Sequence, residues 1–574
     1  MPEDQGRLMD SRWIVFLGLA FGVVAISILR FMQFGDMEPR MDQASFVVWV
    51  QDLLESERFF PLAQDNLGFL QSLKADEDSG LNVILRRIYV AQEHLFLVLG
   101  VVWFSFWSLL FGVGLKAHIA VSIAMGALAL GVLAWFPVML SRTTGAKDLP
   151  PTVWAVVAIF LVGVGNAFLN LFSALGVHNA GLLSLALALV VTQKWLVEIR
   201  PDETLRQSIG AVVLVMLAQA AAFYSHYTTI FLLPMSTIVA IMLRYGLSRR
   251  VRFQTIIIYG GIGLIAATPC FGLVAIGGPT FETDQDFLSR MHWVLIREGH
   301  DLADIWVRAV RWVSWMADLM SPIGLVLGLA GCFALAFKVQ AVLPLALVSV
   351  HFLVGLMVPG FNQYNRTGAY AVIVLCLGAG WSLAFAIEQI CAIWRERRHL
   401  LVGLSGLGLV LAVGTHATYQ WQRLADPGRI PSWHQVTLVQ GEMRPFVSRL
   451  ESLVPEGSIF LAWNYNMSHR IRTLSSRFRR DTRRLRPFQS LVREKDAGRL
   501  RSYVSERQLQ FAAGQPIFML IARHDASRVL GKTEAIFGPE GLNLRRSIEP
   551  QQVATLPWRW ASTKAVDYDL YVIR

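Results

Sequence analysis

Long apolar runs separated by short polar segments fill the chain from Trp13 to about residue 418. A helix that crosses a bilayer needs about 20 consecutive apolar residues, and many of these runs reach that length. We count about twelve candidate segments, at 13–34, 93–113, 116–140, 153–173, 180–196, 208–224, 227–243, 254–276, 322–337, 340–358, 368–390 and 400–418. This pattern predicts an α-helical polytopic membrane protein.

Lys and Arg gather in four of the short loops, and such loops stay on the cytoplasmic side of a membrane. The four are 142–147, 194–206, 244–252 and 395–399. If every segment crossed, the loop 142–147 would lie outside and the C-terminal tail inside. If 93–113 does not cross, the four loops and the N-terminus all lie in the cytoplasm. We therefore predict about 11 transmembrane helices, with the aromatic-rich segment 93–113 a re-entrant or interfacial helix. The first outer loop is then 35–115.

Residues 419–574 have a different pattern, in which polar sequence surrounds apolar runs of strand length. The runs lie at 458–463, 516–521 and 569–573, with helix-like segments between them. This alternation predicts a soluble α/β domain, which the orientation places outside the cytoplasm. The expected organisation is a transmembrane domain over 1–418 and an extracytoplasmic domain over 419–574.

The predicted soluble domain contains a block of eight arginines, at 470, 472, 477, 479, 480, 483, 484 and 486. Near an anionic surface each basic residue contributes about 1 kcal/mol. The block therefore predicts contact with a polyanion or with anionic lipid headgroups. We expect no nucleic acid as a partner, because no recognition motif accompanies the arginines.

The composition agrees with a membrane protein, since 54% of the residues are hydrophobic and 16% are charged. A soluble domain has about 25% charged residues. The four cysteines lie in apolar runs without metal-ligand spacing, so we expect neither a disulfide framework nor a zinc site. The sequence has no acidic residue in the middle of a predicted span, which argues against an ion-coupled transporter.

An acidic segment follows the first apolar run and contains Asp36, Glu38 and Asp42. The next apolar residues recur with helical spacing, and they are Phe46, Trp49, Val50, Leu53 and Leu54. Asp42 lies one turn before this amphipathic helix, where the helix dipole favours an ionised carboxylate. The acids are either the reaction centre of a membrane enzyme or an exposed loop that caps a helix.

Polar residues also gather where later spans reach the outer side, the side predicted for Asp42. They are His178, Asn179, His226, Tyr227, Tyr364 and Arg366. A carboxylate there suits a general base that deprotonates an acceptor hydroxyl. Guanidinium groups bind phosphate oxygens with two hydrogen bonds, and Arg86, Arg87 and Arg366 are outer-side candidates. These groups are what sugar transfer from a polyprenyl-phosphate donor requires.

The chain resembles membrane glycosyltransferases of the GT-C fold, in the branch that holds the lipid A aminoarabinose transferases and protein O-mannosyltransferases. That family follows its first span with D-E-x-x-[FY], where this chain has Asp42-Gln43 and Phe46. Its aromatic segment ending W-L-F-G resembles Ser108-Leu-Leu-Phe111-Gly112, and its late Arg-x-x-x-Tyr resembles Arg366 to Tyr370. His178-Asn179 stands where the family usually has an Asp. Because Gln43 replaces the second acid, Asp36 or Glu38 would have to supply that carboxylate.

The resemblance implies an inverting transferase of the plasma (inner) membrane that uses a polyprenyl-phosphate-linked monosaccharide on the extracytoplasmic side. Asp42, with Asp36 and Glu38, would be catalytic, and the acceptor would be a lipid-linked or cell-surface glycan held by the basic tail. The substrate-binding residues would be Arg86, Arg87, His178, Asn179, His226, Tyr227, Tyr364 and Arg366. A divalent metal, Mg²⁺ or Mn²⁺, stays open, with Asp36, Glu38 and Asp42 as its oxygen ligands.

Two other functions stay open on the sequence. A transporter or flippase of lipid-linked sugar would need polar residues at mid-span depth, and the sequence has few. A membrane scaffold with a basic partner-binding tail would need no acid at position 42.

Overall fold

The computed structural model describes residues 115–144, 176–198, 205–225, 229–245, 302–357, 365–396, 399–425, 443–462, 465–480, 486–487, 497–498, 500–501, 515–544, 548–559 and 565–574, and single residues within 21–32 and at 47, 107 and 110. The chain divides into two compact units. The first unit contains Ile119–Val436 and the second contains Thr437–Arg574, each together with shorter N-terminal segments.

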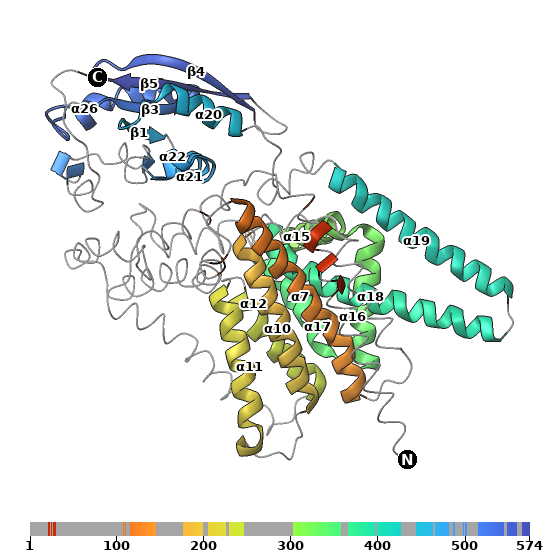
Figure 1. Ribbon diagram of the computed structural model, residues 1–574. Helices are drawn as coiled ribbons and strands as arrows, with labels where there is room; N and C mark the ends of the chain where they lie inside the picture. Colours follow the sequence, from red (N-terminus) through yellow and green to blue (C-terminus); the bar gives the residue numbers. More distant parts are fainter. Residues whose placement is uncertain are drawn as a thin grey trace. The chain divides into compact units, whose positions relative to one another are not determined.

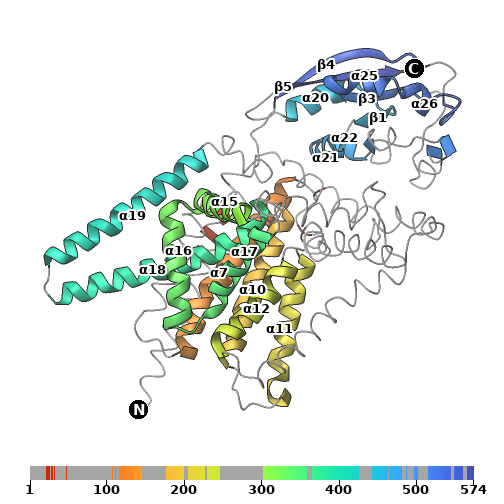
Figure 2. The ribbon, with the colours of Figure 1, turned by 180° about the vertical axis from the view of Figure 1, so that it is seen from behind.

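The first unit is a bundle of apolar helices (Figures 1 and 2). They are α7 (Leu115–Thr144), α10 (Gly176–Glu198), α11 (Leu205–Ser225), α12 (Thr229–Tyr245), α15 (Leu302–Met320), α16 (Pro322–Lys338), α17 (Val342–Met357), α18 (Asn365–Arg395) and α19 (His399–Ala425). Eight of the predicted segments, from 116–140 to 400–418, coincide with helices in this set. Most residues of the other four lie outside the described part of the chain, so the total of about 11 spans stays a prediction.

Within the described ranges, three helical segments are long and apolar enough to cross a membrane, at Leu115–Leu133, Gly368–Arg395 and His399–Arg423. Helices α15 and α16 pass the same test as a pair, but they are bent by 104° where they meet. The chain is therefore an integral membrane protein. Most of α18 is buried among other helices, whereas almost all of α19 is exposed.

Helices α16 and α18 approach so closely that their backbones touch. A Cβ added to Gly331 of α16 would lie 1.8 Å from the backbone oxygen of Gly378, and one added to Gly378 would lie 2.4 Å from that of Gly328. Small residues allow such contact in membranes, where van der Waals packing drives helix association. This pair makes the most extensive contact between any two of the described elements.

We expect Gly331→Ala to destabilise the bundle by about 1–3 kcal/mol, because its methyl group has to push α16 away from α18. The melting temperature of the purified chain in detergent would measure the effect. Gly403→Ala on α19 is the matched control, since nothing lies within 4 Å of its Cβ position. Equal melting temperatures for the two variants would contradict the close packing.

The bend between α15 and α16 lies at Ser321, which has φ 75° and ψ 151°. A residue other than glycine rarely adopts this conformation, and it costs about 1–3 kcal/mol. Ser321 is buried, its Oγ accepts a hydrogen bond of 3.0 Å from the backbone N–H of Gly324, and Pro322 is the first residue of α16. Both features favour a helix start at this point.

The second unit contains a five-stranded sheet in the order β2-β1-β3-β5-β4. Its strands are β1 (Ile459–Ala462), β2 (Arg486–Pro487), β3 (Ile517–Ala522), β4 (Gln551–Arg559) and β5 (Ala565–Ile573). Strand β1 pairs in parallel with β2 and β3, and β5 pairs antiparallel with β3 and β4. The predicted runs 458–463, 516–521 and 569–573 overlap β1, β3 and β5. The domain boundary at 418 and the side of the membrane stay predictions.

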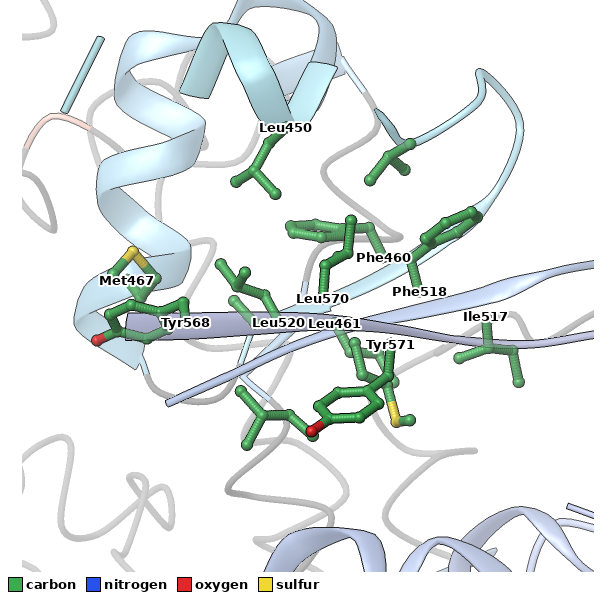
Figure 3. Close-up of a cluster of buried hydrophobic side chains, with 14 of the residues drawn as sticks. Leu450, Phe460, Leu461, Met467, Ile517, Phe518, Leu520, Tyr568, Leu570 and Tyr571 are labelled. Carbon is green, nitrogen blue, oxygen red and sulfur yellow. The ribbon is translucent and has the colours of Figure 1, made fainter. Parts of the chain in front are cut away.

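The described helices of this unit are α20 (Met443–Leu453), α21 (Tyr465–Leu474), α22 (Ser476–Arg480), α25 (Ala526–Leu530) and α26 (Thr533–Phe537), and η5 (Arg523–Asp525) is a 3₁₀ turn. Apolar side chains fill both faces of the sheet (Figure 3). Leu450 of α20 and Leu570 lie on one face, while Tyr571, the next residue of β5, points to the other. This alternation is the two-residue period of a strand.

Arginines of the predicted basic block turn into the second unit where their side chains are described. Arg470 and Arg472 of α21 are each 6% exposed. Arg477 donates hydrogen bonds to the backbone oxygens of Glu451, at 2.6 Å, and Val454. Burial of Arg470 and Arg472, and the use of Arg477 to bind backbone oxygens, leave these three side chains little surface for the predicted contact with a polyanion or lipid headgroups. Contact with anions stays a prediction for the other five arginines, whose side chains lie outside the described part of the structure.

Candidate functional site

Most residues predicted for the site lie outside the described part of the chain. They are Asp36, Glu38, Asp42, Arg86, Arg87, His226, Tyr227 and Tyr364. His178 and Asn179 belong to the first turn of α10, and Arg366 to the first turn of α18, but only their backbones are described. Tyr370 of the Arg-x-x-x-Tyr motif is fully buried within α18. The helix ends that carry these residues can nevertheless be placed.

Helix α11 ends beside the beginning of α10. Ser225, its last residue, shares a hydrogen bond of 2.8 Å with Ser184 in the third turn of α10. Further along, Gln219 of α11 donates hydrogen bonds of 3.2 Å to Thr192 of α10 and Thr237 of α12. The pairs 184–225 and 192–219 show that α10 and α11 run antiparallel. The start of α10, with His178 and Asn179, therefore lies at the end of the bundle where α11 stops, one residue before His226.

The same end of the bundle includes the third predicted corner. At the opposite end, Arg244 of α12 donates to the backbone oxygens of Val197 at 3.4 Å and Gln340 at 3.1 Å. This contact joins the ends of α10 and α12 to the start of α17. Helix α17 consequently ends at the end of the bundle where α10 begins. Helix α18, with Arg366 in its first turn, begins at the same end. All three corners predicted from the sequence thus lie at one end of the bundle.

Helix α15 lies across this end, over the last turn of α17 and the first turn of α18 (Figures 1 and 2). Arg308, only 4% exposed, donates a hydrogen bond of 3.0 Å to the backbone oxygen of Leu356 near the end of α17. A cation is favourable there because the last carbonyls of a helix have no partner within it. A Cβ on Gly368 would lie 2.8 Å from Trp315 and 2.7 Å from Leu319, so α15 covers α18 two residues after Arg366.

A histidine is enclosed between two tryptophans under α15. Trp312 donates its indole N–H to Nδ1 of His351 at 3.0 Å, and Trp315 stacks on the same imidazole with ring centres 5.9 Å apart. Because Nδ1 accepts a hydrogen bond, the proton of the neutral ring belongs on Nε2. The arrangement fixes the orientation of His351 on α17 and holds α15 against that helix.

One face of α19 contacts the junction of α15 and α16. His416 Nδ1 lies 2.8 Å from Ser321 Oγ. Asp318 of α15 forms an ion pair of 2.5 Å with Arg423, whose guanidinium also donates a hydrogen bond of 2.9 Å to the Tyr419 hydroxyl. That hydroxyl is 3.3 Å from the Asp318 carboxylate. Asp318 and Arg423 are both partly exposed.

Sequence reasoning missed several polar residues of this end, namely Arg308, Asp318, His351 and Arg423. Helix α15 contains three tryptophans. The structure buries Trp312 and Trp315 and leaves Trp306 71% exposed. The helical spacing of Arg308, Trp312 and Trp315 was the signal available in the sequence.

Metal binding stays a prediction. Within the described ranges, no three His, Cys, Asp or Glu residues are grouped so that they could hold a metal ion. The proposed oxygen ligands Asp36, Glu38 and Asp42 lie outside those ranges.

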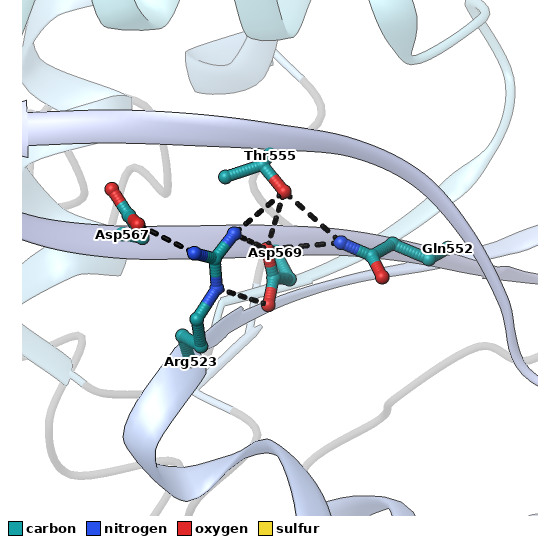
Figure 4. A network of polar contacts seen from close by, with 5 residues as sticks. All are labelled: Arg523, Gln552, Thr555, Asp567 and Asp569. Carbon is teal, nitrogen blue, oxygen red and sulfur yellow. Dashed lines mark hydrogen bonds and ion pairs between the residues drawn. The ribbon is translucent and has the colours of Figure 1, made fainter.

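A second polar network lies in the second unit, where η5 meets β5 and β4 (Figure 4). Arg523 donates hydrogen bonds to Asp569 at 3.0 and 3.2 Å, to Asp567 at 2.7 Å and to Thr555 at 2.9 Å. Burial raises the pKa of Asp569, but the hydrogen bonds from Arg523 and Thr555 outweigh it and hold the pKa below its usual value. Every polar group drawn has a partner within the network, so we assign it a structural role.

Replacing Asp569 with Ala should destabilise the second unit by about 1–3 kcal/mol, because Thr555 and Gln552 lose their shared acceptor. The depressed pKa means that the stabilisation is present above the pKa of an unfolded Asp and is lost as the pH falls through the folded value. Thermal melts of the full chain between pH 3 and 7 would test this. If Asp569→Ala lost as much stability at pH 3 as at pH 7, the predicted pH dependence would be contradicted. Asp525→Ala, in an exposed contact with Arg528, is the control.

No family model matches the chain, and no curated protein matches it. Several solved structures do, and two of them are crystal structures of one enzyme. The crystal structure of ArnT from Cupriavidus metallidurans in the apo state is 12% identical over 97% of this chain and 98% of that chain, with a TM-score of 0.50. The crystal structure of the same enzyme bound to undecaprenyl phosphate is 13% identical over the same shares, with a TM-score of 0.49. ArnT is a lipid A aminoarabinose transferase, and this chain has its GT-C fold, as the resemblance predicted.

Proposed function

We propose that the chain is a membrane glycosyltransferase that transfers a monosaccharide from a polyprenyl-phosphate donor to an acceptor hydroxyl. The ArnT fold over nearly the whole chain supports this, but a fold alone does not establish an activity. The observation that carries the proposal is the gathering of helix ends. The starts of α10 and α18 and the end of α11 lie at one end of the bundle, where α15 covers the start of α18. These are the positions of His178, Asn179, Arg366 and the neighbour of His226.

In the proposed reaction Asp42 is the general base that removes the proton from the acceptor hydroxyl. The oxygen attacks the anomeric carbon as the bond to the donor phosphate breaks, and this single displacement inverts the anomeric centre. Arg366, with Arg86 and Arg87, binds the departing phosphate, for which a guanidinium fork is well suited. Asp36 or Glu38 supplies the second acid that the family has beside its base. Asp36, Glu38 and Asp42 are the ligands for Mg²⁺ or Mn²⁺ if a metal takes part.

His178, Asn179, His226, Tyr227 and Tyr364 line the donor pocket in this proposal. The acceptor is a lipid-linked or cell-surface glycan. The substrate-bearing side is the extracytoplasmic side of the plasma (inner) membrane.

The ends of α19 support this orientation. The segment His399–Arg423 has 25 residues and spans about 37 Å, enough for the bilayer core. Trp394, before its start, and Trp421, near its end, are both well exposed, as tryptophans at the two membrane interfaces are. Because the basic loop 395–399 favours the cytoplasm, Trp421 and Arg423 mark the outer boundary. Asp318 is bound to Arg423, so α15 belongs to the same boundary.

Cysteine labelling in a cysteine-free chain tests the sidedness. In sealed right-side-out vesicles we expect Glu456→Cys, at an exposed position of the second unit, to react fully with an impermeant maleimide. Glu396→Cys, exposed between α18 and α19, should react only after permeabilisation. The reverse pattern would place residues 419–574 in the cytoplasm and end the proposed topology.

The activity is tested with the purified chain in lipid vesicles and a polyprenyl-phosphate monosaccharide labelled in the sugar. With a lipid extract of the native envelope as acceptor source, we expect the label to leave the donor and polyprenyl phosphate to accumulate. A flippase would move the intact donor across the vesicle membrane and release no polyprenyl phosphate. If the donor stays intact and on its original side of the vesicle membrane with every sugar of a broad panel, both functions are contradicted and the scaffold is favoured.

A further inference from the structure

The polar contacts of α19 with α15 and the start of α16 come from a single face. His416, Tyr419, Gln420 and Arg423 recur at i, i+3, i+4 and i+7, and all four approach residues 318–321. The remaining surface of α19 is apolar and exposed, as expected for a helix in lipid. We call these four residues the α19 clasp.

The α19 clasp contacts the last residues of α15 and Ser321, the residue between α15 and α16. The carbonyls of the last turn of a helix have no partner in the helix and need donors from elsewhere. Tyr419 and Gln420 place donors 3.5 Å from the backbone oxygens of Asp318 and Leu319, at the end of α15. His416 holds the Oγ of Ser321, the residue with the strained backbone. The 104° bend is thus contacted from one side at Asp318, Leu319 and Ser321.

The position of α15 in turn determines what surrounds the first turn of α18. Trp315 and Leu319 rest on Gly368, two residues after Arg366. Arg308, two helical turns before Trp315 on the same face of α15, binds the end of α17. A change in the angle between α15 and α16 would therefore displace both arginines relative to each other.

We propose that the α19 clasp positions α15 over the beginning of α18 and thereby sets the place of Arg366 in the donor-phosphate site. The proposal rests on the proposed glycosyltransferase function. His416, Tyr419, Gln420 and Arg423 are positioning residues, since they act through α15 and none needs to touch the substrate.

The ion pair of Asp318 with Arg423 is the part of the clasp that separates positioning from simple stabilisation. Both side chains are partly exposed, and ion pairs of that kind contribute little to global stability. They nevertheless fix an orientation, because Tyr419 holds the same guanidinium and carboxylate. Breaking the pair should therefore change the geometry of the site more than it changes folding.

The experiment uses Arg423→Gln, Asp318→Asn and the exchanged pair Asp318→Arg with Arg423→Asp. Each single variant should raise the KM for the polyprenyl-phosphate donor about 10-fold, which is less than the roughly 10²-fold that a misplacement of about 1 Å can cost. The change in kcat should be smaller, and the melting temperature should be unchanged. The exchanged pair should recover part of the KM. Glu388→Gln is the matched control, since it removes the exposed 3.1 Å pair with Arg395 at the other end of α18 and should leave the KM unchanged.

Spin labels attached at Trp306→Cys on α15 and Trp394→Cys on α18 report how α15 is oriented relative to α18. Both positions are exposed, and the measurement does not depend on enzymatic activity. The distance distribution should broaden in Arg423→Gln and stay narrow in Glu388→Gln. If the wild-type chain transfers no sugar but the distances broaden, the clasp stands and the proposed function fails. An unchanged distribution, or a lower melting temperature with an unchanged KM, overturns the clasp.

Discussion

Replacement of Asp42 by Asn is expected to lower the rate of sugar transfer by about 10²–10⁴-fold, the usual contribution of a general base. Asn keeps the size and hydrogen bonding of the side chain but cannot accept the proton of the acceptor hydroxyl. The loss should therefore appear in kcat, while the KM for the donor changes little. Initial rates with a labelled polyprenyl-phosphate sugar in lipid vesicles would measure both constants.

Glu55→Gln is the control for this prediction, because it removes a carboxylate from the far end of the same predicted helix. Its transfer rate should equal that of the wild type. Asp36→Asn and Glu38→Gln decide which acid replaces the one that Gln43 lacks, since only that variant should approach the loss seen at Asp42. Full activity of Asp42→Asn would remove this carboxylate from the mechanism and leave the fold assignment untouched.

The apolar helices could be predicted from the sequence because run length is a local property. The segments 368–390 and 400–418 needed only hydropathy to be recognised, and both coincide with helices α18 and α19. Strand β4 could not be found in this way. It begins with Gln551 and Gln552 and forms an exposed edge of the sheet, so it has no continuous apolar run.

The site was harder to predict because it depends on contacts between distant residues. The sequence showed that Arg366 and His178 stand beside span ends, and parity placed those ends on one side. The contact of Asp318 with Arg423 joins residues 105 positions apart, and nothing in either local sequence pairs them. The same holds for Trp312 and His351. Hydropathy describes where a helix meets lipid, whereas partners inside a bundle depend on how the helices pack.

The described arginines of the basic block show that charge density in the sequence does not predict which side chains are exposed. Charge density at 470–486 predicted a surface that binds anions, yet Arg470 and Arg472 are buried and Arg477 binds backbone oxygens. A guanidinium has five donors, so it can serve as a support for carbonyl groups as well as a ligand for phosphate. Composition alone does not distinguish an arginine that supports carbonyl groups from one that binds phosphate. The burial of the side chain in the structure does distinguish them.

Replacement of Arg366 by Gln is expected to raise the KM for the polyprenyl-phosphate donor about 10- to 100-fold. A hydrogen bond to a charged group is worth about 1.5–3 kcal/mol, which corresponds to that range. Arg366→Lys should give an intermediate value, because lysine keeps the charge but cannot form the two parallel hydrogen bonds of the guanidinium. The dependence of initial rate on donor concentration would measure each constant.

The control for Arg366 is Arg395→Gln at the other end of the same helix, which should keep the wild-type KM. If Arg366→Gln and Arg395→Gln behave alike, another arginine binds the phosphate, and Arg86→Gln and Arg87→Gln become the variants to compare. The ranking of the KM values for Arg, Lys and Gln at position 366 is the decisive observation. A general loss of folding would affect the Lys and Gln variants equally. A graded series Arg, Lys, Gln in the KM, with one common melting temperature, is the signature of direct phosphate binding at the first turn of α18.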